Sequence, residues 1–285
     1  MKGLIFSIEE FAVHDGEGLR AAIFFKGCPL RCQWCHNPEG LSIRPQRAKN
    51  PNACLHCRRC EAVCPSPGRC TACGRCVPYC PRDLIRIVGE TWEATQLARH
   101  VKGFYPPHTR GGVTLSGGEV LMQPEFLLEL LDALSPLHRA IETSGYCPTD
   151  LFGEVLRHLE FVFMDIKHMD EQQHRTYTGV SNQKILENLE ILKASGVPFV
   201  IRVPVIAGVN DDNANMAALA RRLTGCKSLR FVELLPYNRM AGAKYRMVDM
   251  EYAFSFEAPS IARLEEIVRL FDAQSVHCKY RNPVG

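Results

Sequence analysis

The sequence has almost no excess of charge and no long apolar run. Its 285 residues include 34 Lys and Arg against 31 Asp and Glu, and no block of basic residues forms a stripe. This balance argues against a nucleic-acid-binding surface. No stretch approaches the ~20 apolar residues of a membrane span, and the opening MKGLIFSIEE becomes acidic too soon for a signal peptide. We therefore expect a cytoplasmic protein that binds neither nucleic acid nor membranes, and we expect it to be a monomer.

Cysteine is scarce outside one part of the chain. Of the 14 cysteines, eleven lie between residues 28 and 80. Cytoplasmic thiol pools keep cysteines reduced, so clustered cysteines there are more often metal ligands than disulfides. The other three, Cys147, Cys226 and Cys278, match no motif, and we expect them to be small buried hydrophobic residues.

Beyond residue 110, short β-rich runs alternate with amphipathic helical patterns, which is typical of strand–helix units around a parallel sheet. The spacing of apolar residues predicts helices over 124–134 and 181–196. The expected strands are 21–27, 112–117, 139–144, 161–167, 199–205 and 229–236. Six such units predict an α/β fold, a partial (β/α)6 barrel of the TIM type formed by residues 1–47 and 91–285, whereas strand order and closure stay open.

Residues 48–90 interrupt this pattern, because their cysteine content rises and their helical periodicity vanishes. They contain a repeated C-x2-C-x2-C-x3-C-P run, which is the bacterial ferredoxin spacing for two [4Fe–4S] clusters. In this pattern the fourth cysteine of each run binds the other cluster. Zinc is the alternative, but structural zinc usually takes two ligand pairs separated by a longer loop. We predict an inserted small ferredoxin-like domain with two ligand sets, Cys54, Cys57, Cys60 and Cys80, and Cys70, Cys73, Cys76 and Cys64.

The stretch KGCPLRCQWCHNPEG supplies three more cysteines, Cys28, Cys32 and Cys35. Three thiolates on a four-iron cluster leave one iron open, and an open metal position can bind a substrate. The C-x3-C-x-aromatic-C pattern, completed by Trp34, resembles the signature of radical S-adenosylmethionine enzymes. In those enzymes the open iron binds S-adenosylmethionine, and the reduced cluster cleaves it to a 5′-deoxyadenosyl radical, so the three cysteines would be catalytic ligands. The alternative is a closed cluster whose fourth ligand is His36 or a distant cysteine.

Polar or glycine-rich residues follow the other predicted strands. In a barrel of this type, the C-terminal ends of the strands carry the active site. Gly117 and Gly118 lack a Cβ atom, which would let the backbone approach a ligand closely. Each of these residues also has an ordinary structural interpretation, as a turn or a barrel ion pair, but their common position favours a functional one. The residues are Ser116, Gly117, Gly118, Glu119, Glu142, Asp165, Lys167, Arg202 and Asn238.

Several stretches together resemble the glycyl radical enzyme activating enzymes, in the subgroup with a ferredoxin-like insertion. They are HDGEGLR, FKGCPLRCQWCHNPEG, the two cysteine runs, TLSGGEVLMQPEF, DIKHMD, TGVSNQKILENL, RVPVIAGVND and ELLPYNRMAGAKY. The resemblance implies an oxidoreductase that uses S-adenosylmethionine and three [4Fe–4S] clusters under anaerobic conditions. Its partner would be a glycyl radical enzyme, from which it abstracts a hydrogen of a backbone glycine.

The same resemblance implies contacts with S-adenosylmethionine. The backbone of residues 116–119 would meet its amino group, Trp34 would lie beside its adenine, and Arg202 would lie near the cofactor. Glu17 and Leu19 stand where the family usually has Pro and Ile, so the loop before the first barrel strand departs from the usual pattern.

Glu142, Asp165 and Lys167 match family positions near the methionine carboxylate. There the two acids, with the backbone of Met164, can hold a monovalent cation. The family commonly has Asp where this chain has Glu142, so the acid is kept but is one methylene group longer. Asn238 replaces a His that is common after LLPY in the family.

Three functions are open at this point. The first is the activation of a glycyl radical enzyme, with flavodoxin or ferredoxin as electron donor. The second is a radical S-adenosylmethionine enzyme that acts on a small molecule or free peptide. The third is a non-catalytic iron–sulfur electron carrier, which has no use for the open cysteine triad or the ring of polar residues. Residues 49–86 carry seven Lys or Arg against two acids, which either offset the charge of the clusters or dock an acidic donor.

Overall fold

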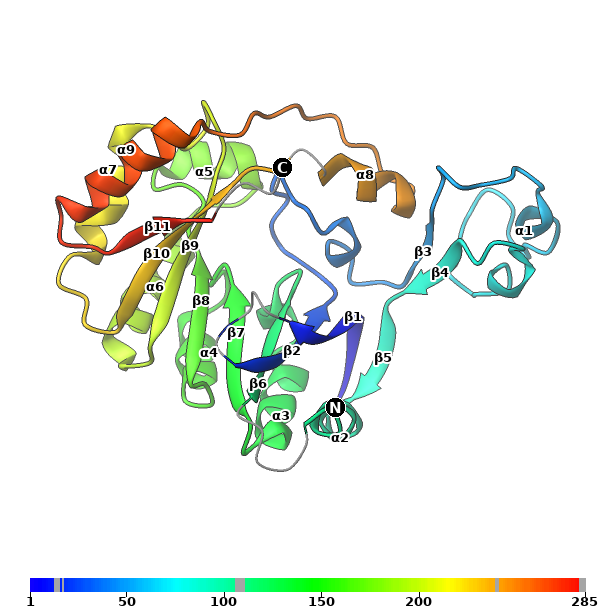
Figure 1. The fold of residues 1–285 in the computed structure, drawn as a ribbon. Helices are drawn as coiled ribbons and strands as arrows, with labels where there is room; N and C mark the ends of the chain where they lie inside the picture. The colour runs from blue at the N-terminus through cyan, green and yellow to red at the C-terminus, as the bar shows by residue number, and fades with distance from the viewer. Residues whose placement is uncertain (13–15, 17, 106–110, 239–240, 282–285) are drawn as a thin grey trace.

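The computed structural model describes residues 1–12, 16, 18–105, 111–238 and 241–281. They form a nine-stranded sheet, a separate two-stranded sheet and the helices around them (Figure 1). Glu17, one of the two departures in the HDGEGLR stretch, lies outside the described residues. Within the described ranges, no helix combines the length and the apolar composition needed to cross a membrane.

Six parallel strands form the centre of the large sheet and lie side by side in the order in which they occur along the chain. This winding is that of a TIM-type barrel, so the predicted partial barrel is confirmed. Every predicted strand is present, with its ends within two residues of the expected positions. The six strands are β2 (Leu19–Phe25), β6 (Gly111–Gly117), β7 (His138–Thr143), β8 (Phe161–Asp165), β9 (Phe199–Val205) and β10 (Leu229–Pro236).

Three further strands extend this sheet at its edges. β1 (Lys2–Ala12) pairs antiparallel with β2, and β5 (Glu90–Glu93) pairs antiparallel with β1. At the opposite edge, β11 (Cys278–Tyr280) pairs in parallel with β10. In the described part of the chain, β5 and β11 are the two edges and do not pair with each other, so the barrel stays open.

Helices cover the outer face of the sheet (Figure 1). α3 (Pro124–Leu134) matches the predicted helix, and α6 (Gln183–Ser195) ends at Gly196, whose φ of 79° is left-handed. In β8, Val162 and Met164 belong to the main core, whereas Phe163 belongs to a smaller cluster on the inner face. The other helices of the barrel are α2 (Ala94–Lys102), α4 (Thr149–Leu156), α5 (Glu171–Thr178), α7 (Asn213–Leu223), α8 (Ala241–Tyr245) and α9 (Ile261–Asp272).

The chain between β3 (Gln46–Lys49) and β4 (Ile85–Val88) stands apart from the barrel (Figure 1). These two strands pair antiparallel and form the base of the projecting segment. Residues 50–84, all of which are described, contain only α1 (Arg59–Ala62) and the 3-10 turn Val77–Tyr79, and none of them is buried. A segment of this size without an apolar core usually depends on disulfides or bound metal. The inserted ferredoxin-like domain stays a prediction.

Candidate functional site

The loop that follows β2, residues 26–41, carries the first three cysteines and is held by a distant helix. We call it the cysteine loop. The backbone N–H groups of Arg31 and Gln33 donate to the carbonyls of Thr178 and Tyr177 at 2.7 and 3.0 Å. These carbonyls lie in the last turn of α5, where backbone acceptors have no partner within the helix. Helix α5 therefore positions the cysteine loop.

The base of the cysteine loop is held by Lys26, whose side chain is fully buried. Its Nζ donates to Oε1 of Gln46 at 3.0 Å and to the carbonyl of Glu39. The Gly27 N–H donates to the Gly40 carbonyl at 2.8 Å. Burial lowers the pKa of Lys26 to about 8, although the charge of Glu39 opposes this shift. Together these contacts close the loop at its base.

The three thiols of the cysteine loop are half-buried, and burial raises their pKa values. The Cys32 thiol has a pKa of about 12. The positive charge of Lys167 counteracts the rise in pKa at both Cys32 and Cys35. A thiol in such surroundings stays protonated at neutral pH, whereas coordination to a metal removes its proton outright. Grouped thiolates are the ligands that iron–sulfur clusters select. The chemistry of these three donors therefore fits such a cluster.

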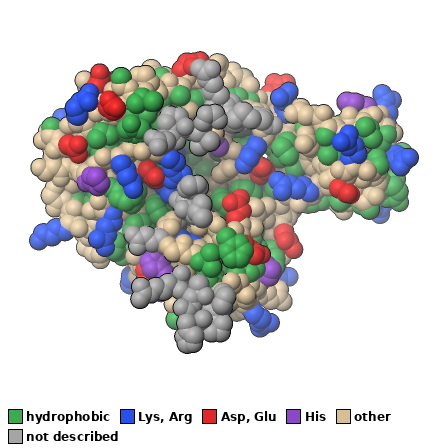
Figure 2. All heavy atoms as spheres, viewed as in Figure 1, with side chains coloured by type: hydrophobic (Ala, Val, Ile, Leu, Met, Phe, Trp, Pro, Cys, Tyr) green, Lys and Arg blue, Asp and Glu red, His purple; other side chains and the backbone are tan. Residues whose placement is uncertain are grey.

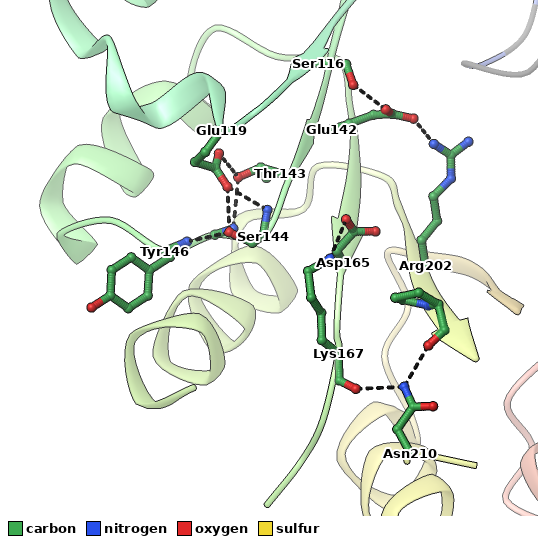
Figure 3. Close-up of polar contacts among 12 residues, drawn as sticks. Ser116, Glu119, Glu142, Thr143, Ser144, Tyr146, Asp165, Lys167, Arg202 and Asn210 are labelled. Atoms are coloured by element: carbon green, nitrogen blue, oxygen red, sulfur yellow. Dashed lines mark hydrogen bonds and ion pairs between the residues drawn. The ribbon is translucent and has the colours of Figure 1, made fainter. Parts of the chain in front are cut away.

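Lys167 and Asp165 form an ion pair beside the cysteine loop, with Nζ of the lysine 3.0 Å from Oδ2 of the aspartate. Burial disfavours the charge of Lys167, but the charge of Asp165 and the hydrogen bond to it raise the pKa of this lysine. The backbone carbonyl of Lys167 accepts a hydrogen bond from Nδ2 of Asn210 at 2.9 Å (Figure 3). The end of β8 thus brings a fixed cation to the cysteines.

Glu119 is buried and joins the ends of β6 and β7. Its carboxylate accepts hydrogen bonds from Oγ1 of Thr143 at 2.6 Å and from the backbone N–H and Oγ of Ser144 at 2.8 and 2.5 Å (Figure 3). Burial raises the pKa of Glu119, and these hydrogen bonds oppose the shift. Its backbone N–H donates to the Gly27 carbonyl at 2.7 Å. The Glu119 side chain therefore has a structural role that the sequence pattern does not predict.

Gly117 and Gly118 lie where backbone segments cross closely. A Cβ atom on Gly118 would lie 2.3 Å from the carbonyl oxygen of Gly27 and 2.4 Å from that of Gly40. Gly117 has a φ of 120°, and a Cβ atom there would lie 2.3 Å from the backbone nitrogen of Phe25. The close approach of β2 and the cysteine loop therefore requires the absence of a side chain at both positions, and the expected approach to a ligand stays a prediction.

Glu142 and Arg202 form an ion pair on the inner face of the sheet (Figure 3). Oε2 of Glu142 accepts a hydrogen bond from Oγ of Ser116 at 2.5 Å. Nε of Arg202 donates to Oε2 of Glu233 at 2.9 Å, and its guanidinium lies 4.1 Å from the ring centroid of Phe163. Residues from four parallel strands, together with the ring on β8, therefore form one connected group.

The expected monovalent-cation site consists of Glu142, Asp165 and the backbone of Met164. In this structure the two acids are turned toward different partners, Glu142 toward Arg202 and Asp165 toward Lys167 (Figure 3). A metal cation held by both acids would have to separate at least one of these pairs. The acids lie on the neighbouring strands β7 and β8, but each already has a cation partner.

Trp34 is buried in a cluster of aromatic rings next to the cysteines. Its ring centroid lies 6.0 Å from that of Tyr177 and 6.1 Å from that of Phe256. Behind these rings, the hydroxyl groups of Tyr237 and Tyr252 share a hydrogen bond of 2.9 Å. Segments far apart in the sequence therefore form an aromatic wall along the cysteine loop.

Tyr245 is a residue of this site that sequence patterns do not identify. It is buried, and its hydroxyl forms a hydrogen bond with the side chain of Cys35. Burial raises the pKa of Tyr245, so the hydroxyl stays protonated as a donor. The only signal was its place at the end of the AGAKY stretch. Asn238 contributes through its backbone, which hydrogen-bonds to His36.

The cysteines of the projecting segment are half-buried or exposed. Four of them line a cavity of about 250 Å³, and one of these four comes from the second run, as the crossed ferredoxin pattern requires. Among the described residues, no three Cys, His, Asp or Glu side chains converge as ligands of a single ion do. A four-iron cluster instead takes one thiolate at each iron, so its ligands surround a volume. We call Cys54, Cys57, Cys60 and Cys80, which line the cavity, the first cysteine set and Cys64, Cys70, Cys73 and Cys76 the second.

The remaining cysteines lie away from this site. Cys147 and Cys278 are buried in the main core, which confirms the expectation for them. Cys226 is only partly buried and packs against the edge of that core, so the expectation is wrong for this residue. It follows the end of α7, where the chain returns toward the surface before β10.

Known proteins resemble this chain along almost its whole length. A family model described as a 4Fe-4S single cluster domain matches residues 14–186. The choline trimethylamine-lyase activating enzyme of Oleidesulfovibrio alaskensis is 35% identical over 95% of this chain and 96% of the relative. The trans-4-hydroxy-L-proline dehydratase activating enzyme of Clostridioides difficile is 37% identical, over 98% and 99%. A solved domain of the pyruvate-formate lyase-activating enzyme of Bacteroides vulgatus has 28% identity and a TM-score of 0.52, and covers 60% of this chain and 99% of that chain.

Proposed function

This chain belongs to the glycyl radical enzyme activating enzymes of the radical S-adenosylmethionine superfamily, and we propose that Cys28, Cys32 and Cys35 hold the [4Fe–4S] cluster with which it activates its partner. When bound, such a cluster supplies the electron for the reductive cleavage of S-adenosylmethionine to a 5′-deoxyadenosyl radical. The radical takes a hydrogen atom from a backbone glycine of the partner enzyme. The second hypothesis is a radical enzyme that acts on a small molecule. Only the three cysteines of the cysteine loop favour it, and they favour the first hypothesis equally.

The observation that carries the proposal is the environment of the three thiols. All three lie on one loop whose backbone is anchored to α5, and burial keeps their pKa values high in the absence of a metal. Lys167 lies beside them with its charge fixed by Asp165. A buried cation stabilises the negative charge that thiolate ligands bring, and it has no such task beside neutral thiols.

We assign the polar end of the barrel to S-adenosylmethionine. Its ammonium group only donates hydrogen bonds, so it requires backbone carbonyls of residues 116–119. The N–H groups of Gly118 and Glu119 are already used, because they donate to carbonyls at the end of β2 at 2.9 and 2.7 Å. Trp34 and the aromatic wall offer the apolar surface that an adenine ring needs.

We assign the methionine carboxylate to the two cations of the inner face, Arg202 and Lys167. Both are paired with acids in this structure, Arg202 with Glu142 and Lys167 with Asp165. A monovalent cation held by these acids and the carbonyl of Met164 would replace the two basic side chains as their partner. Arg202 and Lys167 would then be released toward the carboxylate.

We further propose that the projecting segment holds two more [4Fe–4S] clusters, one on each cysteine set, which brings the total to three. The absence of buried residues from 50 to 84 and the cavity lined by the first cysteine set support this assignment. Lys and Arg side chains gather on the visible face of the segment (Figure 2). Arg58, Arg69, Arg75 and Arg82 of this segment are exposed. Such a set of cations suits an acidic electron donor such as flavodoxin or ferredoxin.

The partner follows from the family and from the open barrel. The relatives activate lyases, dehydratases or decarboxylases of different substrates, so the substrate of this chain's partner is not fixed by family membership. An open barrel edge leaves space for an extended protein loop, and glycine presents a Cα atom without a side chain to block approach. We infer that the protein acts as a monomer in the cytoplasm.

The assignment of the clusters is tested by iron content and by cleavage of S-adenosylmethionine. Anaerobically reconstituted protein should hold about 12 irons per chain. The triple variant Cys28→Ala/Cys32→Ala/Cys35→Ala should lose about four of them and all release of 5′-deoxyadenosine. As a matched control, Cys54→Ala/Cys70→Ala should also lose iron but keep cleavage with dithionite as reductant. Release of 5′-deoxyadenosine by the triple variant would overturn the assignment.

A further inference from the structure

Strand β3 carries two cations toward the projecting segment. Arg47 and Lys49 are separated by one residue, so their side chains leave the strand on the same side, and Ala48 between them is buried on the other. We propose that these residues are charge partners of the two clusters in the segment, Lys49 for the first cysteine set and Arg47 for the second, and that each stabilises the reduced state of its own cluster. This inference rests on the proposed function, which gives the segment its clusters.

Lys49 lies at the first cysteine set. It lines the same cavity of about 250 Å³ as the four cysteines of that set. Its ammonium group hydrogen-bonds to the side chain of Cys54 and interacts with Cys60. A positive charge and a hydrogen-bond donor therefore both reach the first cysteine set.

The charge of Arg47 interacts with Cys70 and Cys76 of the second cysteine set. On one side its Nη2 forms an ion pair with Oδ2 of Asp249 at 2.8 Å. Its Nε is buried and has no hydrogen-bond partner in the described part of the chain. Buried N–H groups without an acceptor are rare in proteins, so we infer that a sulfur atom of the bound cluster accepts from this Nε.

The direction of the effect follows from the charge on the cluster. Each added electron makes a cluster with four thiolate ligands more negative, so a nearby cation and hydrogen bonds to sulfur raise its reduction potential. The Arg47 side chain is 25% exposed and Lys49 is half-buried, whereas the side chain of Arg58 in the projecting segment is 84% exposed. Water and salt screen the exposed cations more strongly. Arg47 and Lys49 should therefore tune the clusters more than the surface arginines do.

Asp249 supplies an opposite charge from outside the segment. It follows the 3-10 turn Arg246–Val248, and the nearby Val248 packs in a small cluster with Ala48 of β3 and Val88 of β4. Because Asp249 neutralises part of the Arg47 charge, its removal should strengthen the effect of Arg47 on the second cysteine set. Substitutions of Arg47 and Asp249 should therefore shift the reduction potential of the same cluster in opposite directions.

The test is a redox titration of the holoenzyme, monitored by electron paramagnetic resonance. The signal that changes on addition of S-adenosylmethionine belongs to the Cys28 cluster and serves as an internal reference. Lys49→Met should lower the potential of one of the two other signals, and Arg47→Met that of the other. Each shift should correspond to an about tenfold lower ratio of reduced to oxidised cluster at a fixed potential, or ~59 mV for a one-electron couple. Asp249→Asn should raise the reduction potential of the cluster whose potential Arg47→Met lowers.

The controls separate charge from structure. Lys49→Arg and Arg47→Lys keep the charge and should restore most of each shift, with about 12 irons per chain in every variant. Unchanged reduction potentials at full iron content would overturn this inference and leave the proposed function intact. The same conclusion would follow if Lys49→Met and Arg47→Met shifted the potential of one and the same signal. If Arg47→Met loses iron, Asp249→Asn becomes the decisive variant. An unchanged reduction potential in Asp249→Asn would then overturn the role proposed for Arg47. Wild-type protein with only about four irons would instead remove the two clusters from the proposed function.

Discussion

Glu142 on β7 and Arg202 on β9 form an ion pair across β8, with the ring of Phe163 against the guanidinium. Neighbouring strands lie about 4.8 Å apart, so the two side chains together bridge about 10 Å of sheet. The extra methylene group of Glu142, relative to the Asp that is common in the family, helps it to reach this distance. The residue that departs from the family pattern is therefore the one that pairs with Arg202 in this structure.

Replacing Glu142 with Asp should tighten the binding of S-adenosylmethionine. A shorter acid pairs less well with Arg202, so less free energy is needed to release the guanidinium toward the methionine carboxylate. We expect an about fivefold lower Kd, which corresponds to ~1 kcal/mol. Anaerobic calorimetric titration of cluster-loaded protein measures it. Weaker binding in the Asp variant would mean that the Glu142–Arg202 pair is part of the ligand-binding arrangement itself.

Gly118→Ala should displace the cysteine loop and lower the iron content by about four atoms per chain. A Cβ atom there meets the carbonyl oxygens of Gly27 and Gly40, and both segments belong to the base of that loop. Gly153→Ala is the matched control, because nothing lies within 4 Å of a Cβ atom at this position in α4. The control should keep its iron and gain stability by about 1 kcal/mol. Full iron content in Gly118→Ala would show that the backbone at Gly27 and Gly40 can shift to make room for the added Cβ atom.

His174 should make the stability of the protein depend on pH below neutrality. Burial lowers the pKa of His174 to about 4, and the ring hydrogen-bonds to the carbonyl of Val180 at 2.7 Å at the end of α5. In the unfolded chain this residue binds a proton near pH 6.5, so the folded state loses up to about 3 kcal/mol as the pH falls from 6.5 to 4. Above pH 6.5 the contribution is constant.

The measurement for His174 is the free energy of unfolding as a function of pH, compared with His174→Gln. The two curves should diverge between pH 4 and 6.5, with wild type falling more steeply, because Gln does not titrate. Parallel curves would contradict the assignment of a neutral, buried His174. Because α5 anchors the cysteine loop, the loss of stability should be accompanied by loss of iron.

Tyr245→Phe should lower the reduction potential of the cluster on the cysteine loop. The substitution removes a hydrogen bond to the sulfur of Cys35, and such bonds stabilise the reduced state. Tyr252→Phe removes a hydroxyl from the same aromatic wall, but that hydroxyl bonds to Tyr237. A redox titration should therefore find a shift in the first variant and a much smaller one in the second. Equal shifts would indicate a general effect of packing.

Much of the fold could be predicted because the barrel repeats one pattern. The six central strands and the helices α3 and α6 each show a period that their neighbours do not disturb. β5 and β11 could not be recognised, because strands of four and three residues are too short to show a period. Their place is set by pairing with distant strands.

The candidate site was predictable only as far as cysteine spacing and strand ends extend. The candidate cluster ligands follow from the spacing of the cysteines, because a loop that binds a cluster must carry its cysteines at set distances along the sequence. Tyr245 and Arg47 could not be found in this way, since each reaches its cysteines from another element. The need for glycine at 118 was visible, but its contact with Gly27 and Gly40 was not, because these residues meet it only in the folded chain.

The most direct test of the central claim is the formation of a glycyl radical in a partner. The protein, S-adenosylmethionine, a low-potential reductant and a candidate glycyl radical enzyme are mixed without oxygen, and the mixture is followed by electron paramagnetic resonance. We predict a glycine-centred doublet that requires Cys28, Cys32 and Cys35 and disappears when the partner's loop glycine is changed to Ala. Consumption of a small molecule in step with 5′-deoxyadenosine release, without a doublet in any glycyl radical enzyme, would contradict the account.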